Sequence, residues 1–80
     1  MGKPAKNRRN EQAILTLGNN IRKYRTAKGL TIQQLANILD VDYSQISRME
    51  RGVVNANISI IFDIAIVLGV EPQLLITALQ

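Results

Sequence analysis

The stretch TIQQLANILDVDYSQISRMERG, residues Thr31–Gly52, carries the signals for two short helices in close succession. Thr31 and Gln34 have the spacing of a capping box, in which each side chain satisfies a free backbone amide of the other residue. Apolar residues then recur at helical spacing as far as Asp40, where this helix is expected to end. Thr31 therefore predicts the start of a short, well-buried helix.

A second helix is predicted to begin after a joint of about three residues, 40–42. Asp42 is a suitable N-cap, the helix is expected to run from Tyr43 to Arg51, and Gly52 is the favoured kind of residue for ending it. So short a joint forces the two helices to cross at a large angle, which is the helix-turn-helix arrangement. In such a pair the second helix projects from the body of the protein and fits a DNA major groove.

One face of this second helix has the composition expected for reading DNA bases. Ile46 and Met49 lie three residues apart and are expected to face inward. The outward face then holds side chains without an acid, namely Tyr43, Ser44, Ser47, Arg48 and Arg51. Arginine can place two donors on O6 and N7 of guanine, and serine can hydrogen-bond to several bases. An ordinary solvent-exposed helix face has a similar composition, so it is the helix-turn-helix context that favours base reading by this face.

Signals on either side of this pair extend the pattern to five predicted helices. A long first helix is expected to run from about Asn10 to Gly29. Its apolar stripe consists of Ile14, Leu17, Ile21 and Tyr24. A fourth helix is predicted over about 57–68, and a short fifth helix begins at Pro72, a favoured first helical residue. The predicted fold class is all-α, a compact bundle of five helices without strands.

The composition excludes several classes of protein. With no Cys and no His in 80 residues, the chain has no disulfide framework, thiol nucleophile, His-based catalysis or Cys/His zinc site. The acidic residues lack the paired spacing of catalytic or metal sites, so we expect no enzyme activity, metal, cofactor or small-molecule ligand. The apolar runs are too short to span a membrane and no apolar signal core follows the basic start, which predicts a cytoplasmic protein.

Positive charge is concentrated towards the N-terminus. Residues 1–28 carry a net charge of +7 and residues 29–80 one of −3, an asymmetry that suggests a polyanionic partner. Residues 1–9 lack apolar periodicity and are interpreted as a flexible basic arm, followed by one domain over residues 10–80. The basic residues of the arm are Lys3, Lys6, Arg8 and Arg9. The arm is either a solvated tail or a segment that reaches a neighbouring minor groove or the DNA backbone.

The predicted fourth helix carries more apolar residues than a core requires. Its core stripe is expected to consist of Ile58, Ile61, Phe62, Ala65 and Leu68. The residues left to point outward are Ile60, Ile66 and Val67, to which the last helix adds Ile76 and Leu79. This surplus predicts an isologous homodimer interface, unless another part of the same chain covers it. Two recognition helices about one turn of DNA apart would read a palindrome.

The sequence also resembles the Cro/C1-type helix-turn-helix family, or XRE family, from about residue 17 to residue 75. The motifs that carry the resemblance are Leu35-Ala36, Ile46-Ser47-Arg48, Glu50-Arg51-Gly52 and Ala65…Leu68-Gly69-Val70. The resemblance implies a lambda-repressor-like five-helix fold and a transcriptional repressor or regulator that binds a specific sequence of double-stranded DNA. Asp40 stands where members often carry Gly, and aspartate tolerates the left-handed conformation better than most residues.

The resemblance also assigns roles to individual residues. Base contacts are expected from Tyr43, Ser44, Ser47 and Arg48. Phosphate contacts are expected from Thr31, Gln33, Gln45, Arg51 and Asn55. Ile32 occupies a position where members often carry a phosphate-binding glutamine, so that contact is lost or moved to Gln33. A structural, partly buried ion pair is implied between Arg25 and Glu50.

Two alternatives keep the DNA-binding fold and change the biological role. An antitoxin would bind a toxin through the additional apolar surface and also repress its own operon. Controllers of restriction–modification systems are similar in having one short domain and an Arg-Gly-x-x-Asn sequence, here Arg51 to Asn55. A toxin gene or a methyltransferase gene beside this one would discriminate between these roles.

Overall fold

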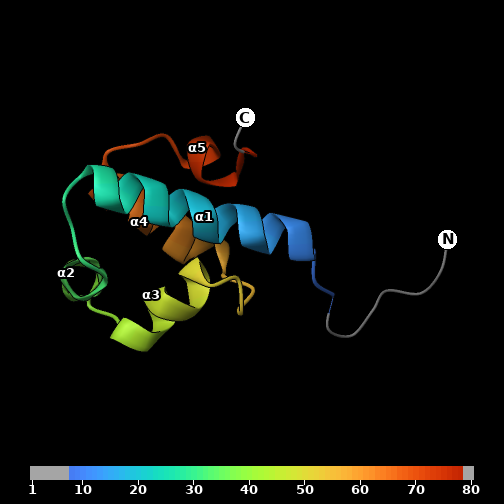
Figure 1. The fold of residues 1–80 in the computed structure, drawn as a ribbon, viewed down its shortest axis with the longest axis horizontal. Coiled ribbons are helices and arrows are strands. Elements are labelled where there is room, and N and C mark those ends of the chain that lie inside the picture. The colour runs from blue at the N-terminus through green and yellow to red at the C-terminus, as the bar shows by residue number, and fades with distance from the viewer. Residues whose placement is uncertain (1–7, 79–80) are drawn as a thin grey trace, which may run out of the picture.

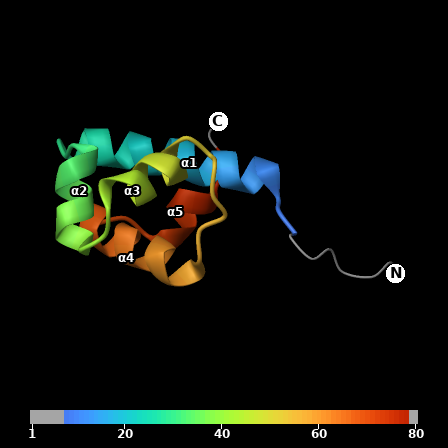
Figure 2. The same ribbon diagram turned by 90° about the horizontal axis from the view of Figure 1, so that it is seen from below.

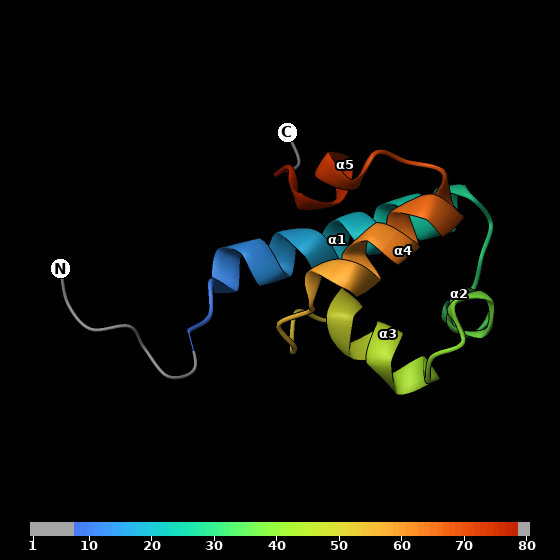
Figure 3. The same cartoon turned by 180° about the vertical axis from the view of Figure 1, so that it is seen from behind.

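The computed structural model describes residues 8–78, which form five helices and no strand. In chain order the helices are α1 (Glu11–Ala27), α2 (Ile32–Leu39), α3 (Tyr43–Glu50), α4 (Ile58–Leu68) and α5 (Pro72–Ile76). The long helix α1 lies at the centre, with α3 on one side and α5 on the other (Figure 1). From behind, α4 lies in front of α1 and alongside α5 (Figure 3). The predicted all-α bundle is confirmed.

The predicted apolar stripe of α1 forms the centre of the core. Ile14, Leu17 and Ile21 are buried, and Tyr24 packs against the core while partly exposed. Gly18 lies on the same helix at its closest approach to α3, where an added Cβ would overlap the backbone carbonyl oxygen of Met49. A side chain at this position would therefore force α1 and α3 apart.

The chain leaves α1 through a left-handed glycine, as the sequence predicts. Gly29 has a φ of 78°, and its amide donates to the carbonyl oxygen of Thr26. The amide of Leu30 donates to the carbonyl oxygen of Arg25 at 3.1 Å. These two bonds are those of a Schellman motif, which satisfies the last carbonyl groups of a helix.

The turn between α2 and α3 depends on a non-glycine residue in the left-handed region. Asp40 ends α2 with a φ of 58° and a ψ of 46°, and the next amide, of Val41, donates to the carbonyl oxygen of Ala36. Asp42 occupies the N-cap position of α3, but its side chain makes no capping hydrogen bond, so the predicted cap is present in position only. Seen from below, α2 and α3 both lie on the side nearest the viewer, and this short turn joins them (Figure 2).

The predicted core stripe of α4 is correct for Ala65 and Leu68, and Ile61 packs against the core, but it is wrong for Ile58 and Phe62. The buried residues of this helix are Ile60, Ile64, Ala65 and Leu68. Ile60, which was expected to point outward, is only 8% exposed, whereas Ile58 and Phe62 are exposed. Because α4 is apolar almost all round, its only polar residues, Ser59 and Asp63, mark the exposed side, and the core stripe lies opposite them.

The other described residues of the predicted dimer interface lie in two different environments. Ile66 is 77% exposed and Ile76 is 60% exposed, so both face outward as expected. Val67 is partly buried and packs against the core. Leu79 lies outside the described residues. With Ile58 and Phe62 added, four exposed side chains form what we call the α4–α5 apolar surface: Ile58, Phe62, Ile66 and Ile76.

A buried polar residue that the sequence pattern did not single out fixes α5 in place. Asn20 is fully buried in α1. Its Nδ2 donates to the carbonyl oxygen of Leu75 at 3.0 Å and to that of Thr77 at 2.8 Å. These carbonyl groups lie at the end of α5, where no amide of the same helix can reach them. Asn20 therefore supplies the donors that the short helix lacks.

Candidate DNA-binding surface

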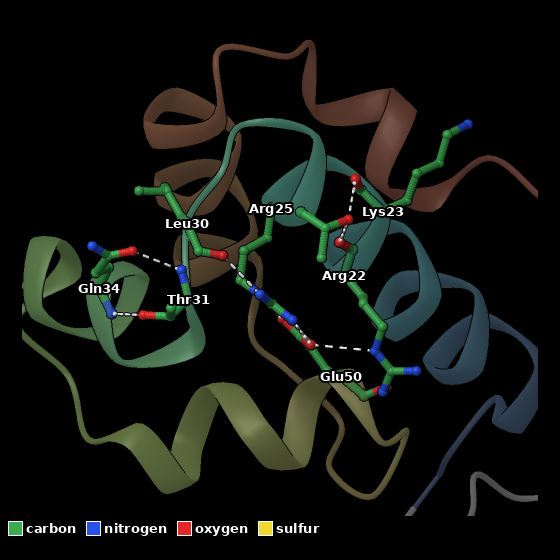
Figure 4. A network of polar contacts seen from close by, with 8 residues as sticks. Arg22, Lys23, Arg25, Leu30, Thr31, Gln34 and Glu50 are labelled. Carbon is green, nitrogen blue, oxygen red and sulfur yellow. Dashed lines mark hydrogen bonds and ion pairs between the residues drawn. The ribbon is translucent and has the colours of Figure 1, made fainter.

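The start of α2 presents free backbone amides to solvent. The Oγ1 atom of Thr31 accepts from the amide of Gln34 at 3.0 Å, and Oε1 of Gln34 accepts from the amide of Thr31 at 2.8 Å (Figure 4). This capping box confirms the sequence prediction. The amides of Ile32 and Gln33 remain without a partner inside the helix. Two free N–H groups and the positive end of the helix dipole are the features with which a helix start can bind an anionic oxygen.

The outward face of α3 carries the predicted base-reading side chains. Tyr43, Ser44 and Arg48 are exposed, and Ser47 is partly exposed. The opposite face, with Ile46, Met49 and Glu50, is buried against the rest of the protein. The sequence pattern therefore placed this helix in the correct orientation. The four side chains project from a rigid element rather than from a loop.

Several predicted phosphate-binding residues already make contacts within the protein. Arg51 is exposed, and its Nε donates to the hydroxyl of Ser47 at 3.3 Å. The Nε2 atom of Gln33 donates to Oδ1 of Asn37 at 2.8 Å. Each of these donors belongs to a group with further N–H bonds, so each can also bind an external oxygen atom. Gln45 is partly buried on α3.

A groove connects α3 to the loop of residues 51–57. It encloses about 330 Å³ and is lined by Ser44, Gln45 and Arg48 from α3 and by Asn55 from the loop. Two predicted phosphate-binding residues, Gln45 and Asn55, therefore share a groove with two predicted base-reading residues, Ser44 and Arg48. The loop itself passes beside the first turns of α1 (Figure 2).

The predicted ion pair between Arg25 and Glu50 is present and holds the end of α3 against α1. Nε of Arg25 lies 2.6 Å from Oε2 of Glu50, and Nη2 lies 2.9 Å from Oε1 (Figure 4). Their side chains are only 11% and 1% exposed. Hydrogen bonding to Glu50 raises the pKa of Arg25 above its ordinary value. The two bonds from Arg25 to Glu50 therefore fix the end of α3 against α1.

A second arginine joins this pair, and the sequence pattern did not assign it a role. Nε of Arg22 lies 3.4 Å from Oε1 of Glu50, and Nη2 of Arg22 donates to the backbone carbonyl oxygen of the same residue. Arg22 precedes Arg25 by three residues, so both lie on one face of α1. That spacing is the sequence signal from which a double contact with Glu50 could have been found.

The fold and this surface define a helix-turn-helix DNA-binding domain. A helix-turn-helix family model matches residues 21–75, which include the two helices and the core that supports them. The chain belongs to this Cro/C1-type helix-turn-helix family, as its sequence motifs suggested.

Two solved structures are similar to this chain in both fold and sequence. The restriction-modification controller protein C.AhdI from Aeromonas hydrophila is 35% identical, with a TM-score of 0.74 over 78% of this chain and 94% of that chain. The hypothetical transcription factor NHTF from Neisseria is 31% identical, with a TM-score of 0.80 over 96% of this chain and 88% of that chain. No curated protein sequence matches the chain significantly.

The family and these neighbours make this protein a DNA-binding transcription regulator. The candidate recognition surface combines the exposed face of α3 with the first turn of α2. Among residues 8–78, none of the helices has the length and apolar character needed to cross a membrane.

Proposed function

We propose that this chain binds a palindromic DNA operator as a homodimer and represses transcription by occupying promoter DNA. The observation that supports this most directly is the shared exposure of two features, the free amides at the start of α2 and the polar face of α3. In a helix-turn-helix domain the first feature binds a phosphate while the second reads the major groove. The proposal is one of binding alone, without catalysis, a cofactor or a small-molecule ligand. A role on DNA agrees with the expected cytoplasmic location.

In this proposal one group of side chains contacts DNA bases and another contacts DNA phosphates. Base edges are read by Tyr43, Ser44, Ser47 and Arg48. Phosphates are bound by Thr31, Gln33, Gln45, Arg51 and Asn55. Phosphate contacts set the register of the protein on DNA and are insensitive to sequence, whereas the base contacts choose the site.

Arg48 provides the test of direct base readout. Arg48→Ala should relax the base preference at one position of each half-site, at a cost of roughly 1–3 kcal/mol for the preferred base. A binding selection on random DNA with both proteins measures this directly, and the consensus also reveals the symmetry and the half-site spacing. Uniform weakening on every sequence would refute base readout by Arg48.

The α4–α5 apolar surface is the proposed dimer interface. Ile58, Phe62 and Ile76 also line a groove of about 400 Å³ between the two helices. We propose that a second copy of this chain packs against this surface. One recognition helix reads few base pairs, and the two-fold symmetry of a DNA palindrome requires two recognition helices. An exposed apolar surface of this kind is unusual on a monomer.

Light scattering across a range of concentrations tests the dimer. The wild-type protein should reach about twice the monomer mass, and Ile66→Glu should remain a monomer because a charge would be buried in the interface. Ile38→Glu is the matched control, since Ile38 is also exposed but lies on α2, outside this surface. A wild-type protein that is monomeric at every concentration would refute the homodimer and leave the surface for another partner, such as a toxin.

Control of a restriction–modification system is the second candidate function. The similarity to C.AhdI supports it, with 35% identity over 94% of that protein. The spacing of Arg51 and Asn55 around the end of α3 supports it as well. A methyltransferase gene beside this one, with an operator selected from the DNA between them, would establish this role. A phage gene cluster or a toxin gene would exclude it.

A further inference from the structure

Arg8 and Arg9, which precede α1, are hydrogen-bonded to the loop that follows α3. Nη1 of Arg9 donates to the backbone carbonyl oxygen of Val53 at 3.2 Å. Nε of Arg9 also donates to Oε2 of Glu11 at 2.7 Å. From the other side, Nδ2 of Asn55 donates to the backbone carbonyl oxygen of Arg8 at 3.4 Å. We call these contacts of Arg8, Arg9, Glu11, Val53 and Asn55 the Arg9 clasp.

The Arg9 clasp lies at the edge of the recognition surface. Asn55, which holds the backbone of Arg8, lines the same groove as Ser44 and Arg48. The contacts join residues that are 44 and 47 positions apart in sequence. The clasp therefore brings Arg8 and Arg9 to the loop that follows α3, although nothing in the local sequence of either segment predicts that contact.

Within the clasp the two arginines have different electrostatic environments. Arg9 is paired with Glu11, and their mutual hydrogen bond raises the pKa of Arg9 and lowers that of Glu11. Arg8 is exposed, and no ion pair within residues 8–78 involves it. The charges of Arg9 and Glu11 thus compensate each other, whereas the guanidinium of Arg8 has no carboxylate partner within residues 8–78.

We propose that Arg8 binds a DNA phosphate at the flank of each half-site and that the Arg9 clasp positions it there. This deepens the proposed function and rests on it. A cation whose backbone is already held beside Asn55 loses less freedom on binding than one on an unattached tail. The phosphate lies outside the bases read by α3, so the contact adds affinity without changing the consensus.

Charge removal at Arg8 tests the contact. Each phosphate contact contributes about 0.9 to the slope of log affinity against log salt, so a dimer with two copies of Arg8→Gln should lose about 1.8. Between 50 and 200 mM salt, wild-type affinity should then fall about 12-fold more than that of Arg8→Gln. Lys23→Gln is the matched control, because it removes the same charge from an exposed side chain of α1 that points away from α3 (Figure 4). Equal slopes for the two variants would overturn the contact.

A second variant tests the positioning role, because the two explanations predict opposite signs. Glu11→Gln adds one unit of positive charge per chain, so simple electrostatics predicts tighter binding to DNA. If the clasp positions Arg8, weakening the ion pair between Glu11 and Arg9 should reduce the affinity for DNA several-fold in spite of that added charge. Tighter binding by Glu11→Gln, with an unchanged circular dichroism spectrum, would overturn the positioning role.

The two levels of the proposal fail in different ways. A wild-type protein that selects no DNA sequence would refute the proposed function itself. A wild-type protein that selects a palindrome, with Arg8→Gln retaining the wild-type salt slope, would refute only this inference. The selected consensus should be the same for Arg8→Gln and wild type, because a phosphate contact carries no base information.

Discussion

Replacing Glu50 by glutamine removes the buried negative charge that faces Arg25 and the half-exposed Arg22. Glutamine has nearly the volume of glutamate, so the change leaves no cavity. One carbonyl oxygen remains to accept a hydrogen bond, but the guanidinium of Arg25, whose side chain is 11% exposed, loses its counter-ion. The perturbation therefore isolates the charge of the pair from its packing.

The expected loss of stability is large for a protein of this size. Breaking a buried ion pair by removing one partner costs about 3–5 kcal/mol, and we expect about 3 kcal/mol because glutamine keeps one acceptor. Arg22 adds little, since its side chain is 52% exposed. A domain of 80 residues is stable by about 4–12 kcal/mol, so Glu50→Gln removes a quarter or more of the total. The melting temperature should fall by about 12–24 °C.

Urea denaturation followed by circular dichroism at a fixed pH measures this loss. The midpoint should fall while the slope of free energy against urea stays constant, because the same surface is exposed on unfolding. The double variant Arg25→Met, Glu50→Met should be more stable than Glu50→Gln, because it leaves no buried charge at position 25 without a partner. A loss below about 1 kcal/mol for Glu50→Gln would refute the reasoning, since it would mean that water solvates Arg25 as it does a surface residue.

Two further substitutions and one titration test separate contacts. Gly18→Ala should cost about 1–3 kcal/mol in thermal unfolding, because its Cβ would overlap the carbonyl oxygen of Met49; an unchanged melting temperature would contradict that close approach. Asn20→Leu should cost about 1–3 kcal/mol and speed hydrogen exchange in α5, since two carbonyl groups lose their donor; wild-type exchange rates would rule the contact out. In a carbon-detected NMR titration, the pKa of Glu11 should lie below that of an exposed glutamate, because Arg9 donates to its carboxylate. Its stabilising contribution is therefore complete above the ordinary glutamate pKa and lost as the pH falls through the lowered value; an ordinary pKa would disprove the Arg9 contact.

The sequence predicts the recognition unit well because its signals there are local. The capping box at Thr31 acts within four residues, and the left-handed turn at Asp40 depends on one backbone position. The inward pair Ile46 and Met49 orients α3 by the helical period alone. The surface of α3 follows from that orientation, so the side chains available for base readout could be identified before any tertiary contact was known.

The rest of the fold depends on long-range contacts, and there the prediction is weaker. On α4, apolar residues all round gave no clear period, and the two polar residues Ser59 and Asp63 were the signal that pointed to the correct face. The Arg9 clasp joins segments 44 residues apart, so no window of sequence contains both partners. Asn20 could be recognised only as a polar residue beside an apolar stripe, since its acceptors lie 55 and 57 residues away.

The contact between Asn20 and the last described residues has a consequence for how the chain folds during synthesis. The amide of Asn20 is buried in α1, but its acceptors at Leu75 and Thr77 are synthesised 55 and 57 residues later. Until these acceptors are available, burying the amide of Asn20 would cost free energy, so we expect this part of α1 to remain in contact with water. We therefore expect the nascent protein to complete its tertiary packing late and in one step, after α3 has formed.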